Sequence, residues 1–549
     1  MKTKKWIYRT GFLLWIFSGS SLPYASGQEE GLKAIDIEDL QAHMKFLSSD
    51  ELAGRATADS SILVAAEYIA GELQKLNIKT IDDNKDYYQN YTLINSMYDW
   101  DRCRITIRNE DREIPINTGE FYLFPFPEGS VEITGEVVFG GYGISEPGQD
   151  FDEYSGVDVT DKVVIVMDGA PLDDEGNSRI ENVSVSGYFR FFSKAMAAQR
   201  AGAKAVLYVY PPNSEYGGLL DEYPNFGSYI TGSIKLKGDE GSGMNFMSGY
   251  TTKLIMADRN VAEHLLEGSG TTLESLQEKI DEELKPVSFT IPGISVTIRS
   301  AVTEKHLEVP NVVGFIEGSD PELKNEVIIY SAHFDHIGAK DEDNIFNGAD
   351  DNASGSTAML ELAEAYSLLP VKPKRSIILL WVSGEEIGLF GSRYYSENPL
   401  ISLDNTVVNL NMDMIGRVKS EADTGASIHM TTRESLFVIG GHQSSELMEI
   451  NNNVFEKQSL TPDYSLNDRD HPERLYYRSD HINFASKDVP VLFFSTGIHT
   501  DYHTVRDTYD KIDFDKLYAV TKLVFILGYE IANRPQRISV DNPYSSWGR

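Results

Sequence analysis

The sequence is poor in cysteine and in positive charge. Its 549 residues include one cysteine, Cys103, so no disulfide can form within the chain. Without a partner thiol, Cys103 is expected to be a small buried residue rather than a metal ligand or a nucleophile. Lysine and arginine number 49 against 84 aspartates and glutamates, which gives a formal net charge of −35. A general nucleic-acid-binding protein needs a basic surface for the phosphates, so this balance argues against that class.

Apolar runs long enough to span a membrane are also missing. A basic segment, residues 2–9, precedes the short apolar run 11–17, and Ala25 and Gly27 suit the small positions before a cleavage site. The run is far shorter than the ~20 residues that a transmembrane helix needs. Residues 1–27 are therefore predicted to be a cleaved signal peptide. This implies an exported protein, periplasmic or extracellular, with no stable membrane span.

The remaining composition is sufficient for a large folded core in more than one domain. Hydrophobic residues make up 41% and aromatic residues 11% of the chain, which argues against wholesale disorder. Residues 28–115 begin with two apolar stripes at helical spacing. Residues 116–300 are rich in glycine, proline, tyrosine and aspartate, and their short apolar runs predict a β-rich unit. From residue 301 to residue 549 apolar strands alternate with helices, which predicts an α/β fold with a mostly parallel sheet between layers of helices.

Ionisable side chains follow four of the predicted strands in the last segment. The clusters are His333, Asp335 and His336 after 326–332; Glu385 and Glu386 after 376–382; Asp413 after 406–412; and His499, Asp501, His503 and Asp507 after 489–495. In an open parallel α/β sheet, the carboxyl ends of the strands form the edge where ligands bind. The four clusters are therefore expected to meet at one site.

The residue types point to metal-assisted hydrolysis. Histidine and carboxylate ligands without cysteine suit catalytic zinc, or manganese or cobalt in the same shell. The chain has no HExxH sequence, which excludes the one-zinc metalloproteases of that type. The loop 347–352 offers a carboxylate that could bridge two ions about 3.5–4 Å apart. Glu385 and Glu386 could divide the remaining work, since one can bind a metal while the other accepts a proton from water.

Five strings in the last segment resemble the co-catalytic zinc aminopeptidases, a family related to glutamate carboxypeptidase and to the transferrin-receptor ectodomain. The strings, in the family's order, are AHFDHIG at 332–338, NGADDNASG at 347–355, SGEEIGLFGS at 383–392, NMDMIGR at 411–417 and YHT at 502–504. Any one of them alone would be a weak signal, and together they are specific. The resemblance implies the zinc exopeptidase fold, a mixed and mostly parallel sheet sandwiched by helices.

The resemblance implies two zinc ions, with manganese or cobalt as possible replacements, and five ligands. His333 and Asp413 would hold different metals, and Asp350 would bridge both. Glu386 and His503 would complete the two shells. The residue-level reasoning leaves His336 and His499 open as alternative imidazole ligands, because each lies close in sequence to a histidine of the set.

The resemblance also implies roles for residues that do not bind the metals. Glu385 would be the general base, and Tyr476 would hydrogen-bond the oxyanion. Asp335 would orient a metal-bound imidazole. Asp351 would support an unusual peptide geometry after the bridging aspartate. Asp480 lies in a string near the site and is expected to support the ligands from behind.

The middle segment has a resemblance of its own. Residues 137–143, 162–169 and 195–210 are similar to a protease-associated (PA) domain, which zinc aminopeptidases often carry inside the peptidase sequence. Residues 116–300 would then be an insertion. The helices of residues 28–115 would belong to the same catalytic domain as residues 301–549.

These features together predict an exported dinuclear zinc aminopeptidase. It would hydrolyse the N-terminal residue from peptides with a free amino end, using a water that bridges the metals and Glu385 as the base. The alternatives are a carboxypeptidase or dipeptidase on the same metal pair, then a one-zinc glutaminyl cyclase, then a non-catalytic receptor-like ectodomain. The sequence leaves open the preferred N-terminal residue, the native metal, the oligomeric state and the role of the insertion.

Overall fold

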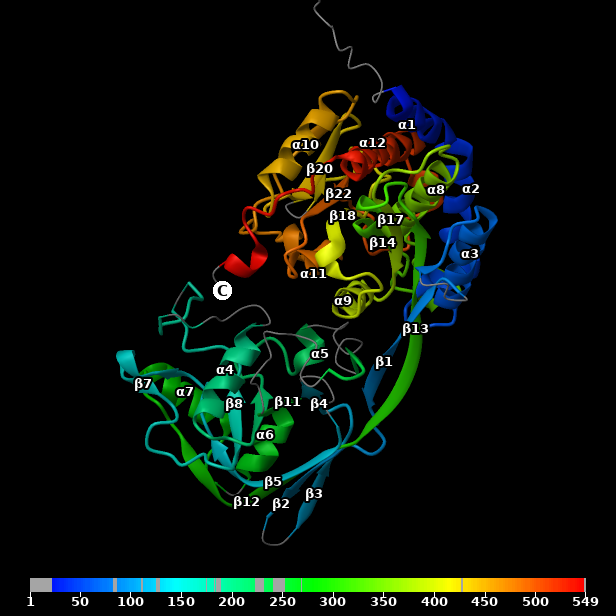
Figure 1. Cartoon of the computed structure of the whole chain (residues 1–549). Coiled ribbons are helices and arrows are strands. Elements are labelled where there is room, and N and C mark those ends of the chain that lie inside the picture. The colour runs from blue at the N-terminus through cyan, green and yellow to red at the C-terminus, as the bar shows by residue number, and fades with distance from the viewer. Residues whose placement is uncertain are drawn as a thin grey trace, which may run out of the picture. The chain divides into compact units, whose positions relative to one another are not determined.

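The computed structural model divides the chain into two compact units. The first consists of residues 1–91 and 308–549, and the second of residues 92–307 (Figure 1). The residues that the structure describes are 22–81, 86–109, 112–124, 129–173, 175–181, 183, 189–222, 232–239, 252–267, 269–425 and 428–547. Most of the predicted signal peptide lies outside these residues. Within them, no helix has the length and apolar character that crossing a membrane requires.

The first unit is built on a mixed sheet whose order is β10-β1-β13-β17-β14-β18-β22-β20-β21. The bounds are β1 Tyr88–Tyr98, β10 Gly232–Leu236, β13 Val302–Ile316, β14 Val327–His333, β17 Ser376–Val382, β18 Thr406–Met412, β20 Ser435–Gly440, β21 Thr461–Asp463 and β22 Val491–Ser495. β17, β14, β18 and β22 are parallel, whereas β13 and β20 run antiparallel to their neighbours. β10 pairs with the part of β1 that belongs to the second unit. The predicted fold class, a mostly parallel sheet with mixed edges, is confirmed.

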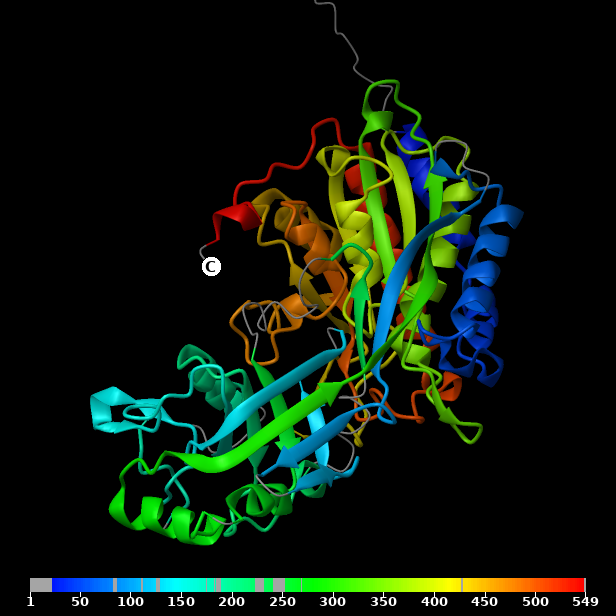
Figure 2. The same cartoon turned by 90° about the horizontal axis from the view of Figure 1, so that it is seen from below.

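The central strands β14, β17 and β18 are buried along their whole length because helices cover both faces of the sheet (Figures 1 and 2). In β14, Ile328 and Tyr330 pack into the core beneath one helical layer, while Val327 and Ile329 pack into the other. This is the alternation expected of a strand. The first layer contains α1 Leu22–Ala34, α2 Ile37–Leu47, α3 Ser61–Lys75, α8 Gly355–Ser367, α10 Ser445–Phe455 and α12 Phe514–Asn533; the second contains α9 Phe390–Glu397 and α11 His481–Ala485. Short strands complete the unit: β15 Ala339–Asp341, β16 Asn344–Ile345, β19 His429–Met430 and β23 Gly497–Ile498.

The N-terminal helices are part of the first unit's core. α1 and α2 contact α8 and α12, which come from the other end of the chain. α1 begins at Leu22 and therefore runs across the predicted cleavage point after Gly27. Asp36 caps α2, since its side chain accepts a hydrogen bond from the N–H of Glu38.

The second unit has its own sheet, of order β3-β2-β12-β5-β8-β9-β11-β4, in which β5, β8, β9 and β11 are parallel. The bounds are β2 Arg104–Arg108, β3 Glu113–Ile116, β4 Phe121–Phe124, β5 Val131–Phe139, β6 Ser145–Glu146, β7 Phe151–Asp152, β8 Val163–Met167, β9 Ala205–Val209, β11 Lys253–Ala257, β12 Phe289–Ser300, α4 Phe189–Arg200, α5 Leu219–Glu222, α6 Arg259–Leu266 and α7 Leu273–Glu283. Cys103 is buried in this unit's core. The unit begins at residue 92, whereas the sequence predicted a boundary at 116.

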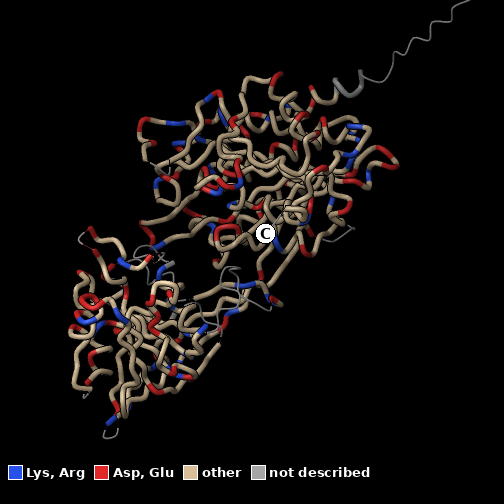
Figure 3. Tube along the Cα trace, turned by 90° about the vertical axis from the view of Figure 1, so that its left-hand side faces the viewer, with Lys and Arg blue, Asp and Glu red and all other residues tan. Residues whose placement is uncertain are grey.

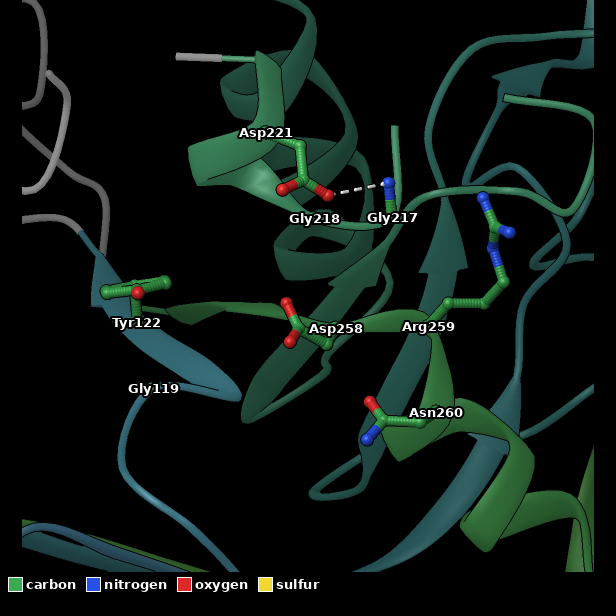
Figure 4. A pocket seen from close by; sticks show the side chains of 8 residues that line it. All are labelled: Gly119, Tyr122, Gly217, Gly218, Asp221, Asp258, Arg259 and Asn260. Carbon is green, nitrogen blue, oxygen red and sulfur yellow. Dashed lines mark hydrogen bonds between the residues drawn. The ribbon is translucent and has the colours of Figure 1, made fainter. Parts of the chain in front are cut away.

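Acidic residues occur throughout both units (Figure 3). In the second unit, a pocket of about 320 Å³ is lined by Gly119, Tyr122, Gly217, Gly218, Asp221, Asp258, Arg259 and Asn260 (Figure 4). Asp221 accepts a hydrogen bond from the N–H of Gly217 at 3.0 Å. Burial and the charges of Asp221 and Glu120 raise the pKa of Asp258 to about 6. The pocket therefore holds a carboxyl group that titrates close to neutral pH.

Candidate metal centre

Two groups of histidine and carboxylate side chains lie past the carboxyl ends of the parallel strands. The first group is His336, Asp351, Glu386 and His503, and the second is His333, Asp351 and Asp413. Within each group the potential ligand atoms all lie within 4.8 Å of one another. Asp351 belongs to both groups, so the two form one site.

The sheet positions these side chains because its parallel strands end at the same edge. His333 is the last residue of β14, and Asp413 directly follows β18. The turn that carries Asp351 can pack closely against His336 because Gly348 has no side chain. A Cβ on Gly348 would lie 2.2 Å from the Asp351 carbonyl oxygen and 2.5 Å from Cγ of His336, and its φ of +55° is also one that L-residues rarely adopt.

In the second group, the potential ligand atoms lie at the separations expected of ligands that share one metal ion. His333 Nε2 lies 3.4 Å from Asp351 Oδ1 and 3.3 Å from Asp413 Oδ1. Ser479 Oγ donates a hydrogen bond of 2.8 Å to the other oxygen of Asp413. That bond leaves Asp413 Oδ1 facing the imidazole.

The first group has a similar geometry with one shorter contact. His503 Nε2 lies 3.2 Å from Asp351 Oδ2 and 3.0 Å from Glu386 Oε2. His336 Nδ1 lies 2.5 Å from Glu386 Oε1 and 3.7 Å from Asp351 Oδ2. The structure therefore brings His336, which the sequence left as an alternative ligand, against the carboxylate of Glu386.

The donor set fits divalent metal ions. Around a tetrahedral zinc with bonds of about 2.0–2.1 Å, ligand atoms lie about 3.3–3.4 Å apart, close to the separations between His333, Asp351 and Asp413. Among the described residues, no lysine or arginine forms an ion pair with Asp351, Asp413 or Glu386, whose ion-pair partners are imidazoles. Buried carboxylates without a permanent cation are costly, and a metal ion would compensate them.

Asp350 does not take the bridging position assigned to it from the sequence. Its Oδ1 accepts a hydrogen bond of 2.6 Å from the N–H of Gly416, and its Oδ2 lies 3.4 Å from His499 Nε2. The shared residue is its neighbour Asp351, and the cis peptide bond follows Asp351 rather than Asp350. The two carboxylates leave the turn in different directions, so a difference of one residue exchanges their partners. His499, the other alternative ligand, is turned toward Asp350 and not toward the two groups.

Asp507 fixes this turn, although the sequence gave it no role beyond membership of the fourth cluster. Its buried carboxylate accepts hydrogen bonds from the N–H of Asp350 at 3.0 Å and from the N–H of Asp351 at 3.0 Å. Two backbone donors on one carboxylate hold both peptide planes. The only sequence signal for this role was its position after a strand.

Arg55, from the N-terminal segment, ties the loops of the site together. Its guanidinium is buried and donates to the carbonyl oxygens of Phe334 at 2.8 Å, Asn347 at 2.7 Å and Gly348 at 3.0 Å. Burial lowers the pKa of Arg55 to about 10. It also donates to the carbonyl oxygen of Leu47, eight positions away, but its three partners in the loops of the site are 279–293 positions away, so a local sequence pattern could not have identified this role.

Asp335 lies behind His333. Its Oδ1 is 3.7 Å from His333 Nδ1 and accepts a hydrogen bond of 3.2 Å from the N–H of Glu385. Thr57 Oγ1 donates to Asp335 Oδ2 at 2.7 Å. The carboxylate is thus fixed by Thr57 and by the backbone of Glu385, while the hydrogen-bond contact of the imidazole is with the carbonyl oxygen of Asp335, 3.1 Å from His333 Nδ1.

Two carboxyl groups near the site hold protons more strongly than usual. Burial raises the pKa of Glu385 well above its ordinary value, and the charges of Glu386 and Asp413 raise it further. Burial also raises the pKa of Asp480 to about 7. The pKa of His333 is raised as well: burial lowers it, but the charges of Asp413 and Glu385 raise it well above the ordinary value. Several strongly shifted pKa values at one place are typical of functional sites.

Tyr476 is not placed at the two groups. It is fully buried in an aromatic cluster with His442, His481 and Trp547, whose ring centroids lie 5.1–6.0 Å away. Its pKa is raised by burial and then by other tyrosines rather than by the carboxylates of the site. The short helical turn 475–477 directs this side chain into the core.

The phenol beside the site is Tyr502. Its ring stacks on His503 with centroids 3.8 Å apart. Burial raises the pKa of its hydroxyl, and the charges of Asp351 and Glu386 raise it further. The ring of Tyr502 therefore lies against a potential ligand of the first group. The sequence quoted Tyr502 in the YHT string but gave the phenol role to Tyr476.

Comparison with known proteins gives a family for the segment that carries the site. Residues 311–527 match the sequence model of peptidase family M28. A probable leucine aminopeptidase 1 of Trichophyton verrucosum (strain HKI 0517) is 27% identical over 268 residues, which cover 47% of this chain and 66% of that relative. The leupeptin-inactivating enzyme 1 of Streptomyces exfoliatus is 37% identical over 109 residues, 19% of this chain and 22% of the relative. The chain thus spans only part of the length of these curated relatives.

A solved structure shares the fold over almost the whole chain. An aminopeptidase from Aneurinibacillus sp. strain AM-1 matches with a TM-score of 0.52 and 20% identity, covering 94% of this chain and 98% of that one. At this level of identity the likeness concerns the fold. It agrees with the zinc exopeptidase architecture predicted from the sequence.

Proposed function

The segment from residue 311 to residue 527 belongs to peptidase family M28, and from this premise we propose that the chain is an exported aminopeptidase that works with two zinc ions. It would remove N-terminal residues from peptides with a free amino end. The observation that carries the proposal is the position of Asp351, whose Oδ1 faces His333 while its Oδ2 faces His503. A carboxylate shared in this way suits a pair of divalent cations about 3.5–4 Å apart.

Five residues would hold the pair. His333 and Asp413, which the resemblance had assigned to different metals, lie in one group and would bind one cation, Glu386 and His503 would bind the other, and Asp351 both. Manganese or cobalt could occupy the same shell. When bound, the cations would lower the pKa of a water molecule and polarise the scissile carbonyl.

His336 would position Glu386 rather than bind a cation. Its Nδ1 is 2.5 Å from Glu386 Oε1, closer than two ligands of one zinc ion normally lie but suited to a charge-assisted hydrogen bond. The other oxygen of Glu386 faces His503. His336 thus occupies one oxygen of the carboxylate and leaves the second for the metal.

Glu385 is the residue best placed to move the proton. It directly precedes the potential ligand Glu386, and a carboxyl whose pKa is raised by burial would accept a proton from water and deliver it to the leaving amine. Asp335 fixes the N–H of Glu385 and so holds the base in register with His333. Tyr502 would donate a hydrogen bond to the developing oxyanion, the part first assigned to Tyr476.

Removal of N-terminal residues is favoured over carboxypeptidase action by the state of nearby arginines. A carboxypeptidase needs a free cation for the substrate carboxylate. Three arginines of the catalytic segment already lie against carboxylates: Arg393 against Glu397, Arg417 against Asp501 and Arg478 against Glu473. These ion pairs make the three poor candidates for such a pocket and so support a substrate with a free amino end.

The remaining parts of the proposal concern the second unit and export. The second unit interrupts the catalytic unit in the chain, which supports the idea that it is an inserted PA domain. The basic and apolar N-terminus supports export by a signal peptide.

The test uses the Glu385→Gln variant and a panel of aminoacyl p-nitroanilides with their N-acetylated counterparts. The wild-type chain should cleave the free-amine substrates and carry two zinc ions per chain by elemental analysis. Glu385→Gln should lose about 10²–10⁴-fold in kcat while keeping both ions. Cleavage of N-blocked substrates alone, or full activity in the variant, would overturn the proposal. A count of one zinc ion would favour a cyclase instead.

A further inference from the structure

The structure holds His503 differently from the other four proposed ligands. His333 ends β14 and Asp413 follows β18, so the sheet positions these two directly. His503 instead lies on the loop 499–508, all of whose residues are described and none of which belongs to a helix or a strand. Its side chain is 35% exposed, whereas those of the other four ligands are 1–11% exposed. Burial therefore fixes this imidazole less than it fixes the other ligands.

The backbone at His503 also needs support from its surroundings. Its φ of +54° lies in the left-handed region, which residues other than glycine adopt infrequently. A residue persists in this region where the contacts around it over-determine its conformation. The contacts of its neighbours in the loop therefore decide whether the imidazole points at the site.

Asp501, two positions before His503, provides such contacts. Its side chain is buried, and three cationic side chains donate to its carboxylate. Oδ2 accepts hydrogen bonds from Arg417 at 3.1 Å and from Lys511 at 2.7 Å, and Oδ1 accepts one from Arg506 at 2.8 Å. Three charge-assisted hydrogen bonds from different directions fix the carboxylate in both position and orientation.

The carbonyl oxygen of Asp501 closes the turn that contains His503. It accepts hydrogen bonds from the N–H of Thr504 at 3.0 Å and from Oγ1 of Thr504 at 2.9 Å. The turn begins at Asp501 and closes at Thr504, so it encloses Tyr502 and His503. The residue from which this turn starts is thus the one whose side chain the three cations hold.

Arg417 extends these contacts to the turn that carries Asp351. Its guanidinium is buried, and Nη1 lies 3.7 Å from Oδ1 of Asp507. Asp507 in turn accepts the hydrogen bond from the N–H of Asp351. Arg417 therefore links the loop of His503 to the turn of Asp351, whose Oδ2 lies 3.2 Å from the imidazole.

Neutralising Asp501 alone would not require three cations. The buried Arg417 supplies one positive charge already. Arg506 and Lys511 are partly exposed, and exposed ion pairs contribute little to the stability of a fold. They come from the loop beyond His503, on the other side of the imidazole from Asp501. Their contacts therefore bring the two sides of the His503 turn together.

We propose that Asp501 is a positioning residue for His503 and thereby for the cation of the first group. The inference rests on the proposed function, because it takes the five ligands assigned there. Without the carboxylate, the turn loses the contacts that hold it, and the imidazole leaves the site. Arg417 keeps its contact with Asp507, so the turn of Asp351 is retained. Asp501 thus governs one cation of the pair and not both.

The test compares zinc binding by the full-length wild type and by Asp501→Asn, measured by competition with a chelator. Residues that orient a metal ligand typically contribute about 10–100-fold to metal affinity. We therefore expect one of the two zinc ions to bind about 10–100-fold more weakly in the variant and the other to bind as in wild type. Asp510→Asn is the matched control, because Asp510 is an exposed aspartate nearby in sequence that accepts a hydrogen bond from Thr508. It should bind both ions as wild type does.

A double variant separates positioning from a general loss of stability. His503→Ala removes the ligand through which Asp501 acts, so adding Asp501→Asn should weaken zinc binding by less than about twofold more. Losses that multiply in the double variant would overturn the proposal. So would an Asp501→Asn protein that binds both ions like wild type, or one that loses affinity for both equally.

A second route remains if Asp501→Asn does not fold. Arg506→Met with Lys511→Met removes the two partly exposed cations and should weaken the same single ion by about 10-fold or less. Unchanged affinity in that protein would also overturn the proposal. A wild-type chain that binds fewer than two zinc ions would overturn the proposed function and this inference with it. Two ions in wild type and no effect of Asp501→Asn would overturn this inference alone.

Discussion

Both units place buried acidic side chains beyond parallel strands, but they compensate the charge in different ways. In the first unit, Asp351 and Asp413 face imidazoles, and no lysine or arginine among the described residues pairs with them. In the second unit, Asp168 follows β8 and accepts hydrogen bonds from the guanidinium of Arg190 at 2.8 and 3.2 Å. The same guanidinium donates to Glu222 at 2.5 Å.

The difference separates a structural charge network from a metal site. Arg190 always carries its charge, so the carboxylates of the second unit are neutralised by the protein itself. Lys194 adds a second buried cation, whose Nζ donates to the carbonyl oxygens of Tyr142 at 2.6 Å and Met167 at 2.9 Å. Imidazoles can instead offer lone pairs, and the carboxylates around them then need a cation from outside the chain. The type of side chain that faces the buried carboxylates therefore distinguishes the two sheet edges better than the number of acidic residues does.

The largest effect should follow from removing the shared carboxylate of the first unit. Asp351→Asn is expected to weaken zinc binding by more than about 100-fold, because both groups lose a ligand, and to abolish peptidase activity. Asp350→Asn is the matched control, since Asp350 contacts Gly416 and His499 instead. It should weaken zinc binding by about 10-fold or less. Zinc affinity measured by competition with a chelator distinguishes the two, and equal losses would return Asp350 to the bridging role.

The next effect should appear when the second unit's network loses its cation. Arg190→Met leaves Asp168 and Glu222 with an uncompensated buried charge, which costs about 3–5 kcal/mol in the free energy of unfolding. Arg299→Met is the control in the same unit, because its ion pair with Glu132 is exposed and contributes about 0–1 kcal/mol at most. Urea unfolding measures both. A lower zinc content in Arg190→Met than in wild type would contradict the conclusion that the charge network of the second unit has no part in metal binding.

A smaller effect is expected from substitution of Tyr502, the tyrosine that stacks on His503. Tyr502→Phe should lower kcat by about 10²–10³-fold with little change in KM, because the lost hydrogen bond forms to the oxyanion and not to the bound peptide. Tyr476→Phe should stay within about threefold of wild type, since its hydroxyl is buried in an aromatic cluster. The reverse order of the two kcat values would restore the assignment first made for Tyr476.

The sheet edge of the first unit was predictable from the sequence because its strands are continuous apolar runs. Each run ended at a cluster of ionisable residues, and parallel strands bring such ends together. His333, Glu386, Asp413 and His503 all belong to these clusters and lie in the two groups, and the resemblance to the zinc aminopeptidases selected them from the other cluster residues. The strand pattern carries this information without any knowledge of the turns.

The choice between Asp350 and Asp351 was not predictable on the same grounds. The two are adjacent and identical in type, and their directions depend on hydrogen bonds from their N–H groups to Asp507, more than 150 positions away. Arg55 is hidden in the same way, since it acts on distant carbonyl oxygens. The boundary of the second unit was misplaced because β1 begins in one unit and ends in the other, and its alternating pattern does not change on the way.

The smallest effect is the pH dependence of the stability that Lys194, the buried lysine of the second unit, contributes. Burial lowers the pKa of Lys194 below its ordinary value of about 10.4, so in the pH range just below that value the unfolded chain binds a proton that the folded chain has released. Stability linked to Lys194 therefore rises with pH in this window, by up to about 1 kcal/mol per pH unit. The urea midpoint of wild type should climb relative to that of Lys194→Met between about pH 8 and pH 10. Parallel pH profiles for the two proteins would show that Lys194 keeps an ordinary pKa, so that it stays charged through most of this window and shares the charge balance of the second unit with Arg190.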